Sequence, residues 1–485
     1  MSSALLGWVV ALPLAAVPGI LVFHRRPNAR EAVSIVTGLL LLLLVSSLWG
    51  DVSQGGRPMM ILAEPLPGIL LAFRVEPLGL LLALVASSLW VVTTVYAIGY
   101  MRGHHEKNQT RFYAFFAIAI ASTMGAAFAA NLVTLFVFYE ALTLSTFPLV
   151  THAGTDAAHR GGRTYLGLLL ATSIGFLLFA IVWTWQITGT TEFTPGGILS
   201  GRAGAGTLTV LYALFLFGIG KAALMPFHRW LPAAMVAPTP VSALLHAVAV
   251  VKVGVFCVLK VSVYIFGIDL LADTGASIPM LYVAAITILF ASLIALYQDN
   301  LKRRLAYSTV GQLGYVVLGA TLATTWGTIG SGLHIAMHAS GKITLFFCAG
   351  AIMVAAHKTE VSQLDGIGRR MPWTLGAFTI GALSMIGVPP AAGFVSKWYL
   401  LLGGLTAEQY AILVVLFAST LLNIAYYMPI VYAAFFRNPP PGSKPHGEAP
   451  WPMVGALMAT ACLTLVLFVY PEPVVLLLRA LTEGG

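Results

Sequence analysis

Long apolar runs separated by short polar stretches make up most of this chain. A membrane-spanning helix needs about 20 consecutive apolar residues, and runs of that length recur throughout the sequence. They predict about fourteen helices, at 4–23, 32–49, 77–98, 111–129, 131–150, 164–187, 207–229, 239–266, 279–298, 304–324, 327–356, 372–403, 409–436 and 451–479. The boundary near 129–131 depends on Asn131, and the even helix count depends on that boundary.

Prolines interrupt two of these stretches. The first break lies between Lys221 and His246, at Pro226, Pro232, Pro238 and Pro240, and the second lies inside 372–403, at Pro389 and Pro390. A proline cannot continue a helix. The backbone groups that it frees are tolerated at membrane depth only when they are buried in protein or line a water-filled cavity. We therefore expect two broken helices that line a buried path.

The composition agrees with a membrane protein. The 485 residues are 59% hydrophobic and 9% charged, whereas a soluble domain has about 25% charged residues. The pattern indicates an all-α polytopic protein embedded in a lipid bilayer. The three cysteines lie in apolar runs without paired spacing, which excludes a disulfide framework and a CxxC site.

The positive charges predict the orientation of the chain. With the N-terminus outside, 17 of the 26 lysines and arginines fall in odd-numbered loops, and four fall on the other side at Arg57, Arg74, Arg202 and Arg479. Cytoplasmic loops are rich in lysine and arginine. We therefore expect a multi-pass protein of the cell inner (plasma) membrane with both termini on the outer side. This placement explains the net charge of +9 without a nucleic-acid partner.

The five remaining lysines lie within the predicted helices, at Lys221, Lys252, Lys260, Lys342 and Lys397. Each costs about 2.5–3.5 kcal/mol at the bilayer centre, so a helix that keeps one is a candidate for ion transport. Only one of the 17 acids, Glu140, is predicted to lie within the membrane. It is either a structural partner of one lysine or part of a proton relay, and the excess of lysines favours the relay.

A second cluster lies in the run 327–356. His334, His338 and Lys342 are spaced i, i+4, i+8 and share one helix face. Histidine titrates near physiological pH and can pass a proton between its two nitrogens. A metal site or simple packing contacts are the alternatives. No carboxylate or third histidine lies nearby in the sequence, so we expect no metal.

Three further residues are possible accessories: His228, His246 and Lys260. His228 lies at the end of the first broken helix, where capping is an alternative role. Lys260 lies eight residues after Lys252 and either extends to the membrane interface or belongs to an exit path. The sequence contains no nucleotide-binding loop, catalytic triad, or haem or cluster ligand set. We expect no cofactor, no catalytic residues, and a transporter subunit rather than an enzyme.

Several stretches resemble the antiporter-like subunit family. This family comprises the proton-pumping membrane subunits of respiratory complex I, their relatives in membrane-bound hydrogenases, and the large subunits of Mrp-type cation/proton antiporters. The resemblance rests on YEALTLSTFPLV around Glu140, GKAALMPFHRWLPAAMVAPTPVSALLHA, VKVGVF, DNLKRRLAYSTVGQLGYVVLG, HIAMHASGKITLFFCAG and GVPPAAGFVSKWYLL. It covers about 77 to 436.

The resemblance implies fourteen helices with two inverted five-helix repeats, each containing one broken helix. It divides the chain into N-terminal helices (1–110), a first repeat (111–266), a second repeat (279–436), and a proline-rich connector with the last helix (437–485). Other membrane subunits of a hetero-oligomeric complex are implied partners.

The resemblance also implies roles. Glu140 and Lys221 would be the acid and base of a first half-channel, and Lys252 the central relay residue. His334, His338 and Lys342 would continue the relay to Lys397, the terminal lysine of a second half-channel. Lysine at 397 resembles the D-type subunits of Mrp antiporters and some complex I subunits, whereas another complex I subunit type carries glutamate there. The combination of LLHA and VKVGV resembles Mrp large subunits, so we favour a protein that resembles the D-type Mrp subunits.

Three functions fit these features. The first is an ion-translocating subunit that exchanges protons for sodium or another monovalent cation. The second is the proton-translocating subunit of a redox-driven oxidoreductase complex, and the third is the energy-coupling membrane subunit of a bicarbonate-accumulation complex. The residues that distinguish these functions belong to other chains.

Overall fold

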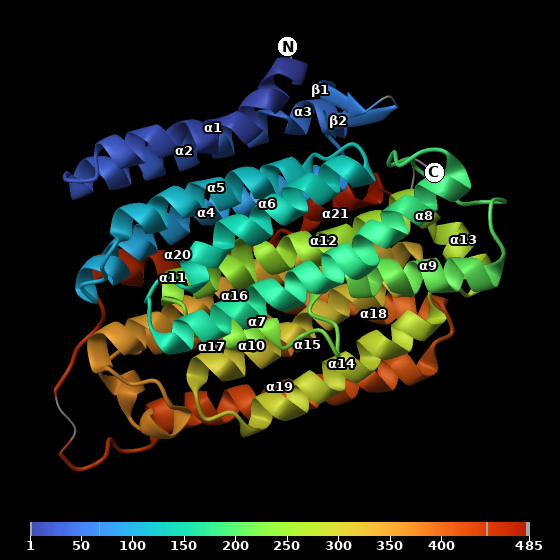
Figure 1. The fold of residues 1–485 in the computed structure, drawn as a ribbon. Coiled ribbons are helices and arrows are strands. Elements are labelled where there is room, and N and C mark those ends of the chain that lie inside the picture. The colour runs from blue at the N-terminus through green and yellow to red at the C-terminus, as the bar shows by residue number, and fades with distance from the viewer. Residues whose placement is uncertain (1, 67, 443–444, 482–485) are drawn as a thin grey trace.

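The computed structural model describes residues 2–66, 68–442 and 445–481, and nearly parallel helices dominate it (Figure 1). Among these residues, eleven helices are long and apolar enough to span a membrane, and two shorter apolar helices, Ala205–Gly218 and Pro372–Ile386, each end at a break. The chain is therefore a polytopic α-helical membrane protein, as predicted.

The elements follow one another in four groups. The N-terminal group comprises α1 Ser2–Val22, α2 Pro27–Ser47, α3 Trp49–Ser53, β1 Met59–Leu66, β2 Ile69–Arg74 and α4 Pro77–Gly103. The second comprises α5 Gln109–Ala127, α6 Leu132–Val150, α7 Asp156–Thr172, α8 Leu178–Thr188, α9 Ala205–Gly218, α10 Trp230–Ala233, α11 Thr239–Ala243, α12 Val250–Val261 and α13 Ile268–Thr274. The third comprises α14 Ile278–Tyr297, α15 Leu301–Thr321, α16 Thr325–Ala356, α17 Pro372–Ile386, α18 Gly393–Thr406 and α19 Tyr410–Phe436, and the last comprises α20 Trp451–Val469 and α21 Glu472–Arg479.

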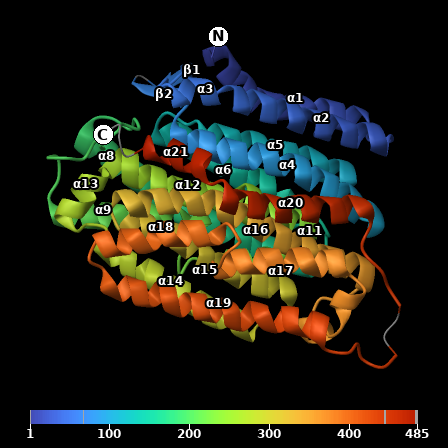
Figure 2. The same ribbon diagram turned by 180° about the vertical axis from the view of Figure 1, so that it is seen from behind.

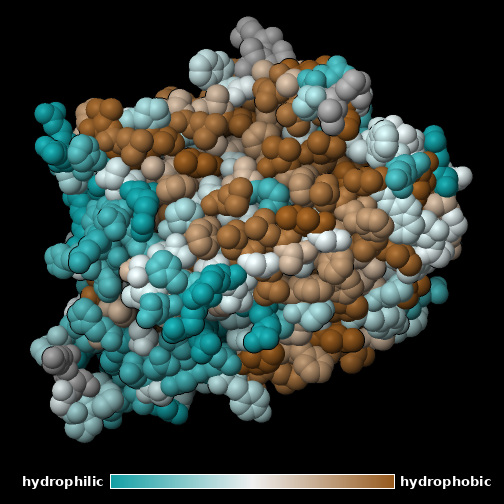
Figure 3. Space-filling model, viewed as in Figure 1, coloured by the Kyte–Doolittle hydropathy of each residue, from teal (hydrophilic) through white to brown (hydrophobic). Residues whose placement is uncertain are grey.

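The two ends of the bundle differ in charge. One end, which we call the basic end, carries the loops that hold Arg25 and Arg26, Lys107, Lys358, Arg369 and Arg370, and Arg437. The opposite end, which we call the hairpin end, carries β1 and β2, the start of α1 and the end of α21 (Figure 1). Figure 3 shows hydrophilic residues gathered at the basic end, on the left, and hydrophobic residues across the flank. Which end faces the cytoplasm stays a prediction.

Asparagine caps mark the start of α6 and of α15. Asn131 caps α6 by accepting a hydrogen bond from Thr134 N (2.8 Å), and this separates α6 from the end of α5 at Ala127. The boundary predicted at Asn131 is therefore present. Asn300 caps α15 in the same way, accepting from Arg303 N (3.1 Å).

Both predicted breaks are present. After α9 the chain passes through a 3₁₀ turn (η2, Gly220–Ala222), α10 and a second 3₁₀ turn (η3, Ala234–Val236) before α11 begins. Between α17 and α18 the chain turns at Gly387, whose φ of +84° favours glycine. The helix after the first break contains two π-helical segments, η4 Leu244–Val248 and η5 Ser262–Phe266.

Three features differ from the prediction. The polar stretch before α4 forms an antiparallel β-hairpin instead of a loop, because alternating main-chain pairs such as Met60 with Phe73 join β1 to β2. The single span predicted at 451–479 is two helices, α20 and α21, and Pro471 lies at their junction. The span predicted from 164 begins at Asp156, where Thr155 caps α7.

The segment Thr239–Phe266 forms the centre of the bundle. Every residue of its most apolar stretch is buried. The helices α1 and α2 form one edge of the bundle, and α14 and α19 form the opposite edge (Figures 1 and 2). Close packing at the centre depends on Gly254 in α12. A Cβ at this position would lie 2.4 Å from the carbonyl carbon of Lys221, so only glycine lets α12 approach the first break this closely.

We expect Gly254→Ala to lower the stability of the protein by about 1–3 kcal/mol, because the added methyl meets main chain that cannot move aside. Gly455→Ala is the matched control, since a Cβ there meets nothing within 4 Å. Thermal unfolding in detergent checks this. A melting temperature for Gly254→Ala equal to that of Gly455→Ala would show that the close approach is not required.

Candidate functional site

Lys221 lies in the first break, within η2. Its Nζ donates to the main-chain oxygen of Tyr139 (2.9 Å) and to the hydroxyl of Thr143 (2.5 Å). The same atom lies 3.1 Å from the centroid of the Tyr139 ring, where a cation is attracted to the ring face. Lys221 is completely buried, so these groups of α6 replace water around its ammonium.

Glu140, the next residue of α6, lies within electrostatic range of Lys221. Its two carboxylate oxygens are buried and have no hydrogen-bond partner among the residues that the structure describes. Lys221 and Glu140 therefore interact through space and not by a direct hydrogen bond. A buried carboxylate without a donor is suited to take up a proton or a cation.

Lys252 of α12 contacts His338, one of the two histidines of α16. Its Nζ lies 2.5 Å from Nδ1 of His338. The rings of His338 and His334 are stacked, with centroids 5.8 Å apart. Nε2 of His338 is buried without a hydrogen-bond partner in the described part of the chain. The predicted spacing therefore places both rings on one side of α16, with His338 against α12.

His334 connects this pair to the second break. Its Nδ1 lies 2.8 Å from Ser396 Oγ, and its Nε2 lies 3.1 Å from Gln312 Oε1. Gln312 Nε2 donates to the main-chain oxygen of Met385 (3.1 Å), and Lys397 Nζ donates to the same oxygen (3.0 Å). A series of polar contacts therefore links the second break to α12 across α15 and α16.

Lys342 lies on a branch of this series. Its Nζ donates to Ser308 Oγ (2.9 Å) and Tyr427 OH (3.1 Å). His246, in η4, lies within electrostatic range of Lys342, and both of its ring nitrogens are buried without a hydrogen-bond partner among the described residues. The residues of the predicted stripe on α16 therefore have different partners. The histidines contact residues next to the second break, and Lys342 lies nearer the basic end.

Lys260 is completely buried, which argues against the first of its two predicted roles, extension to the membrane interface. Its Nζ lies 3.0 Å from Oε2 of Glu76 and donates to the main-chain oxygen of Ala129 (2.7 Å). The reason is that the start of α4 and the turn between α5 and α6 cover this side of α12 and supply a carboxylate.

His228 lies in the turn before α10, with its ring centroid 6.2 Å from that of Tyr307. Within the described ranges, no hydrogen bond joins its side chain to another predicted site residue. Likewise, no hydrogen bond joins Lys221 to Lys252. The predicted relay residues therefore form two clusters, one at the first break and one between α12 and the second break, and His228 and Lys260 lie outside both.

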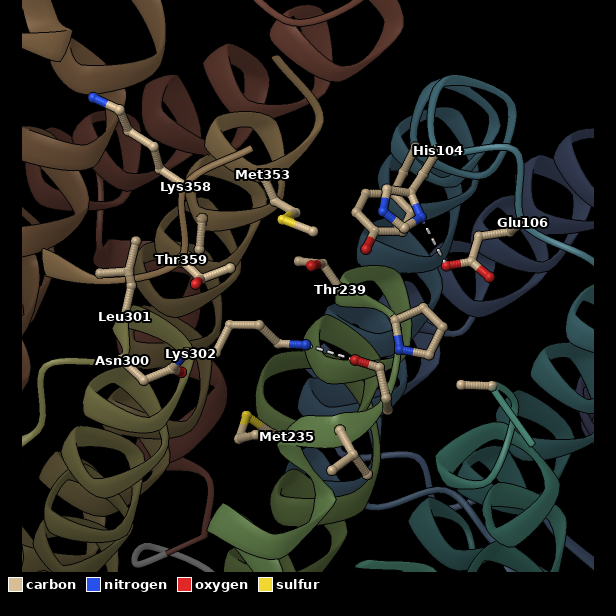
Figure 4. Close-up of a pocket in the computed structure, with 16 residues that line it drawn as sticks. His104, Glu106, Met235, Thr239, Asn300, Leu301, Lys302, Met353, Lys358 and Thr359 are labelled. Carbon is tan, nitrogen blue, oxygen red and sulfur yellow. Dashed lines mark hydrogen bonds and ion pairs between the residues drawn. The ribbon is translucent and has the colours of Figure 1, made fainter. Parts of the chain in front are cut away.

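A cavity of about 340 Å³ lies at the basic end, and we call it the vestibule (Figure 4). Lys302 extends into it from one side, and His104 and Glu106 line the other side, while Lys358 lies at its edge with the ammonium directed away. Lys302 Nζ donates to the main-chain oxygen of Ala237 (2.5 Å) just before α11. His104 Nδ1 lies 3.1 Å from Glu106 Oε1.

The vestibule is electrically coupled to the interior. Lys302 lies within electrostatic range of Glu106 on the rim and of His246 in η4. Partial burial and the nearby Arg370 lower the pKa of Lys358, which lies beyond the end of α16. The basic end therefore carries titratable groups that interact electrostatically with His246, and His246 interacts in the same way with Lys342.

Sequence reasoning missed three residues that contact the predicted ones: Gln312, Ser396 and Glu76. Gln312 is a lone amide in an apolar helix, and Ser396 is adjacent to Lys397, so either could have been found by asking what solvates the buried cations. Glu76 falls in a stretch predicted as an outer loop. The depth of Lys260 was the available signal, because a buried ammonium requires a carboxylate or carbonyls at the same level.

The chain is similar to two groups of characterised proteins. A family model described as "NADH:quinone oxidoreductase/Mrp antiporter, TM" matches residues 129–423. NADH-quinone oxidoreductase subunit N of Desulforudis audaxviator (strain MP104C) is 33% identical over 382 residues, which cover 78% of this chain and 75% of that protein. The D-type subunit of the Na(+)/H(+) antiporter of Alkalihalophilus pseudofirmus is 28% identical over 444 residues, covering 90% and 87%.

The fold is also similar to a solved structure. A chain in the structure of the Mrp complex from Dietzia sp. DQ12-45-1b superposes with a TM-score of 0.87 at 22% sequence identity, covering 100% of this chain and 97% of that one. The family model spans more than half of the chain, and the 33% identical relative is covered over three quarters of its length. The chain therefore belongs to the NADH:quinone oxidoreductase/Mrp antiporter family of antiporter-like membrane subunits.

Proposed function

We propose that this chain is an ion-translocating subunit of a multi-subunit antiporter that exchanges sodium or another monovalent cation for protons. The observation that carries the proposal is the buried series of polar contacts from Lys252 through His338, His334 and Gln312 to the oxygen that Lys397 shares. Buried ionisable groups arranged in series are costly in a membrane protein and typical of proton pathways.

The first cluster would supply the input of this series. Glu140 takes up a proton at its unpartnered carboxylate, and the loss of its negative charge changes the electrostatic field at Lys221. Lys252 then gives a proton to Nδ1 of His338. Transfer on to His334, whose ring centroid lies 5.8 Å away, requires water or a ring rotation. The vestibule is the proposed entry at the basic end, since titratable groups such as Lys302 and His104 line it.

The energies involved are moderate. Moving one charge across 100 mV involves about 2.3 kcal/mol, and a shift of one pKa unit corresponds to about 1.36 kcal/mol. A membrane potential can therefore drive protons between groups whose proton affinities differ by less than about two pKa units.

The proposed architecture has fourteen crossings and two inverted repeats, 111–266 and 279–436. Two matching junctions support it. Leu132 N donates to Thr191 O and Leu301 N donates to Thr359 O, both at 2.9 Å, directly after the capping asparagines Asn131 and Asn300. The asparagines also form isolated bridges with Glu192 and Glu360. The first junction lies at the hairpin end and the second at the basic end, as inversion requires.

In this architecture the basic end faces the cytoplasm and both termini lie outside. The concentration of lysine and arginine at that end supports the orientation. The relatives named as an antiporter subunit and a quinone oxidoreductase subunit support assembly with other membrane subunits. We propose the same for this chain, which would hold the proton pathway while its partners complete the complex.

The second candidate function is the proton-translocating subunit of a redox-driven complex. The 33% identity to a protein named NADH-quinone oxidoreductase subunit N favours it. The relay would be the same, but electron transfer in partner chains would drive it. A subunit of a bicarbonate-accumulation complex remains the third alternative. Cation-dependent proton movement in vesicles without electron donors distinguishes the first candidate from the others.

Glu140→Gln should abolish cation-dependent proton transport in everted vesicles while assembly is retained, because glutamine has similar size but cannot carry the proton. Glu140→Asp should retain part of the activity. The measurement is the pH change inside the vesicles after cation addition, with the amount of assembled complex quantified. Normal transport by an assembled Glu140→Gln variant would refute the relay at the first break.

Gln312→Met should reduce the same transport about tenfold or more, equivalent to about 1.4 kcal/mol in the rate-limiting barrier. The substitution keeps the side-chain size but removes the link between His334 and Met385 O. Thr309→Val is the matched control, because this buried hydroxyl on the same helix bonds to Leu305 O of its own turn. Equal transport by the two variants would contradict a role for Gln312.

A further inference from the structure

Three charged residues close the hairpin end of α12. Lys260 Nζ lies 3.0 Å from Oε2 of Glu76, and Oε1 of Glu76 accepts from Nε of Arg74 (3.1 Å). Arg74 also donates to the main-chain oxygen of Phe193. We call Lys260, Glu76 and Arg74 the hairpin-end cluster.

A carbonyl, a carboxylate and two aromatic rings surround the ammonium of Lys260. It donates to the main-chain oxygen of Ala129 (2.7 Å) and faces the carboxylate of Glu76. Its Nζ also lies 4.3 Å from the ring centroid of Phe193 and 5.5 Å from that of Phe256. Carbonyl, carboxylate and aromatic faces together stabilise a buried cation, so this position is built to hold a protonated lysine.

Exposure increases in order along the cluster. The side chains of Lys260, Glu76 and Arg74 are 0%, 4% and 19% exposed. The charges therefore form a line from the buried centre of α12 to the surface at the hairpin end. A proton that leaves Lys260 toward this surface meets the Glu76 carboxylate first and water near Arg74 next.

Glu76 is turned toward Lys260 for a reason other than helix capping. It occupies the N-cap position of α4, yet its side chain makes no capping hydrogen bond. The strand β2 places it there, because Arg74 N donates to Phe128 O (2.7 Å) and Ala130 N donates to Ala72 O (2.9 Å). The β-hairpin thus fixes Glu76 and Arg74 against the turn that also supplies the carbonyl of Ala129.

The two matching junctions, at Asn131 and at Asn300, have different surroundings. At the basic end, Asn300, Leu301 and Thr359 border the open vestibule (Figure 4). At the hairpin end, the corresponding junction lies beside Ala129, whose oxygen Lys260 occupies. The hairpin-end cluster therefore lies beside one junction, whereas the vestibule lies beside the matching junction at the basic end.

Lys260 also lies in line with the relay. It follows Lys252 by eight residues on α12, so the two side chains share a face and lie about 12 Å apart along the helix axis. Cys257, between them, lies within electrostatic range of both Lys221 and Lys260. Transfer over that distance requires water or a side-chain movement.

We propose that Lys260 and Glu76 form the release site for protons at the hairpin end, which is the outer side in the proposed topology. This inference rests on the proposed function of the chain as a proton-translocating subunit. In the release step a Lys260 N–H bond breaks and an O–H bond forms on Glu76, which leaves a neutral amine and a neutral acid. Glu76 then gives the proton to water, Arg74 stabilises the carboxylate that results, and the amine accepts the next proton arriving along α12.

Lys260→Arg tests the step directly. Arginine keeps the positive charge and the ion pair with Glu76, but a guanidinium does not release its proton in proteins. We expect a melting temperature close to that of the parent and a loss of proton transport of about tenfold or more in everted vesicles that contain the assembled complex. A purely structural ion pair would tolerate arginine, so transport at the parental rate would overturn the inference.

Glu76→Gln is the second variant, and Glu31→Gln is its matched control. Glu31 is as buried as Glu76 and is also paired with two basic side chains, those of Arg30 and Arg102, but it lies at the basic end of α2. We expect Glu76→Gln to lose transport and Glu31→Gln to keep it, at similar levels of assembly. Equal transport by these two variants would overturn the release site and leave the proposed function intact. Absence of cation-dependent transport in the parent would instead overturn the proposed function, and the release site with it.

Discussion

The cost of removing a lysine ammonium from water is the constraint on which this structure depends. Lys221, Lys252, Lys260 and Lys342 are completely buried, and Lys397 is half-buried. An unpaired buried charge costs several kcal/mol, so each ammonium requires polar atoms at its own depth. Main-chain carbonyls meet this need at four of the five lysines.

Two of these four lysines, Lys260 and Lys397, use carbonyls from places where helices end. Lys397 donates to the oxygens of Met385 and Ile386 in the last turn of α17, and Lys260 donates to that of Ala129 after α5. Such positions carry the partial negative charge of a helix C-terminus and leave carbonyls without intrahelical partners. A helix end can therefore stabilise a buried cation directly, and at the second break the prolines contribute because they interrupt the helix.

Much of this arrangement could be predicted from the sequence. The apolar runs, the prolines and the lysines at Lys221 and Lys397 indicated two broken helices with a cation at each, and Asn131 marked the boundary between α5 and α6. The local pattern contains these signals because spans, caps and breaks depend on neighbouring residues. The family resemblance, rather than spacing, supplied the expected roles and repeats.

Partners across the bundle could not be predicted. The contacts of Gln312 with His334 and of Glu76 with Lys260 join residues far apart in the chain, and no local pattern encodes them. The β-hairpin was also missed, because its docking on the turn after α5 is tertiary. Of the two roles predicted for Lys260, extension to the interface does not agree with its burial, since the start of α4 and the turn between α5 and α6 cover it.

Lys252 differs from the other four lysines, because in the described residues its ammonium is bonded to the imidazole of His338 and not to a carbonyl. Its proton is therefore held by a group that can itself accept it, which makes this contact the centre of the proposed relay. The most direct measurement is proton–cation exchange by the assembled complex in proteoliposomes carrying Lys252→Met. A continuous relay predicts loss of exchange with assembly retained, and exchange near the parental rate would contradict it.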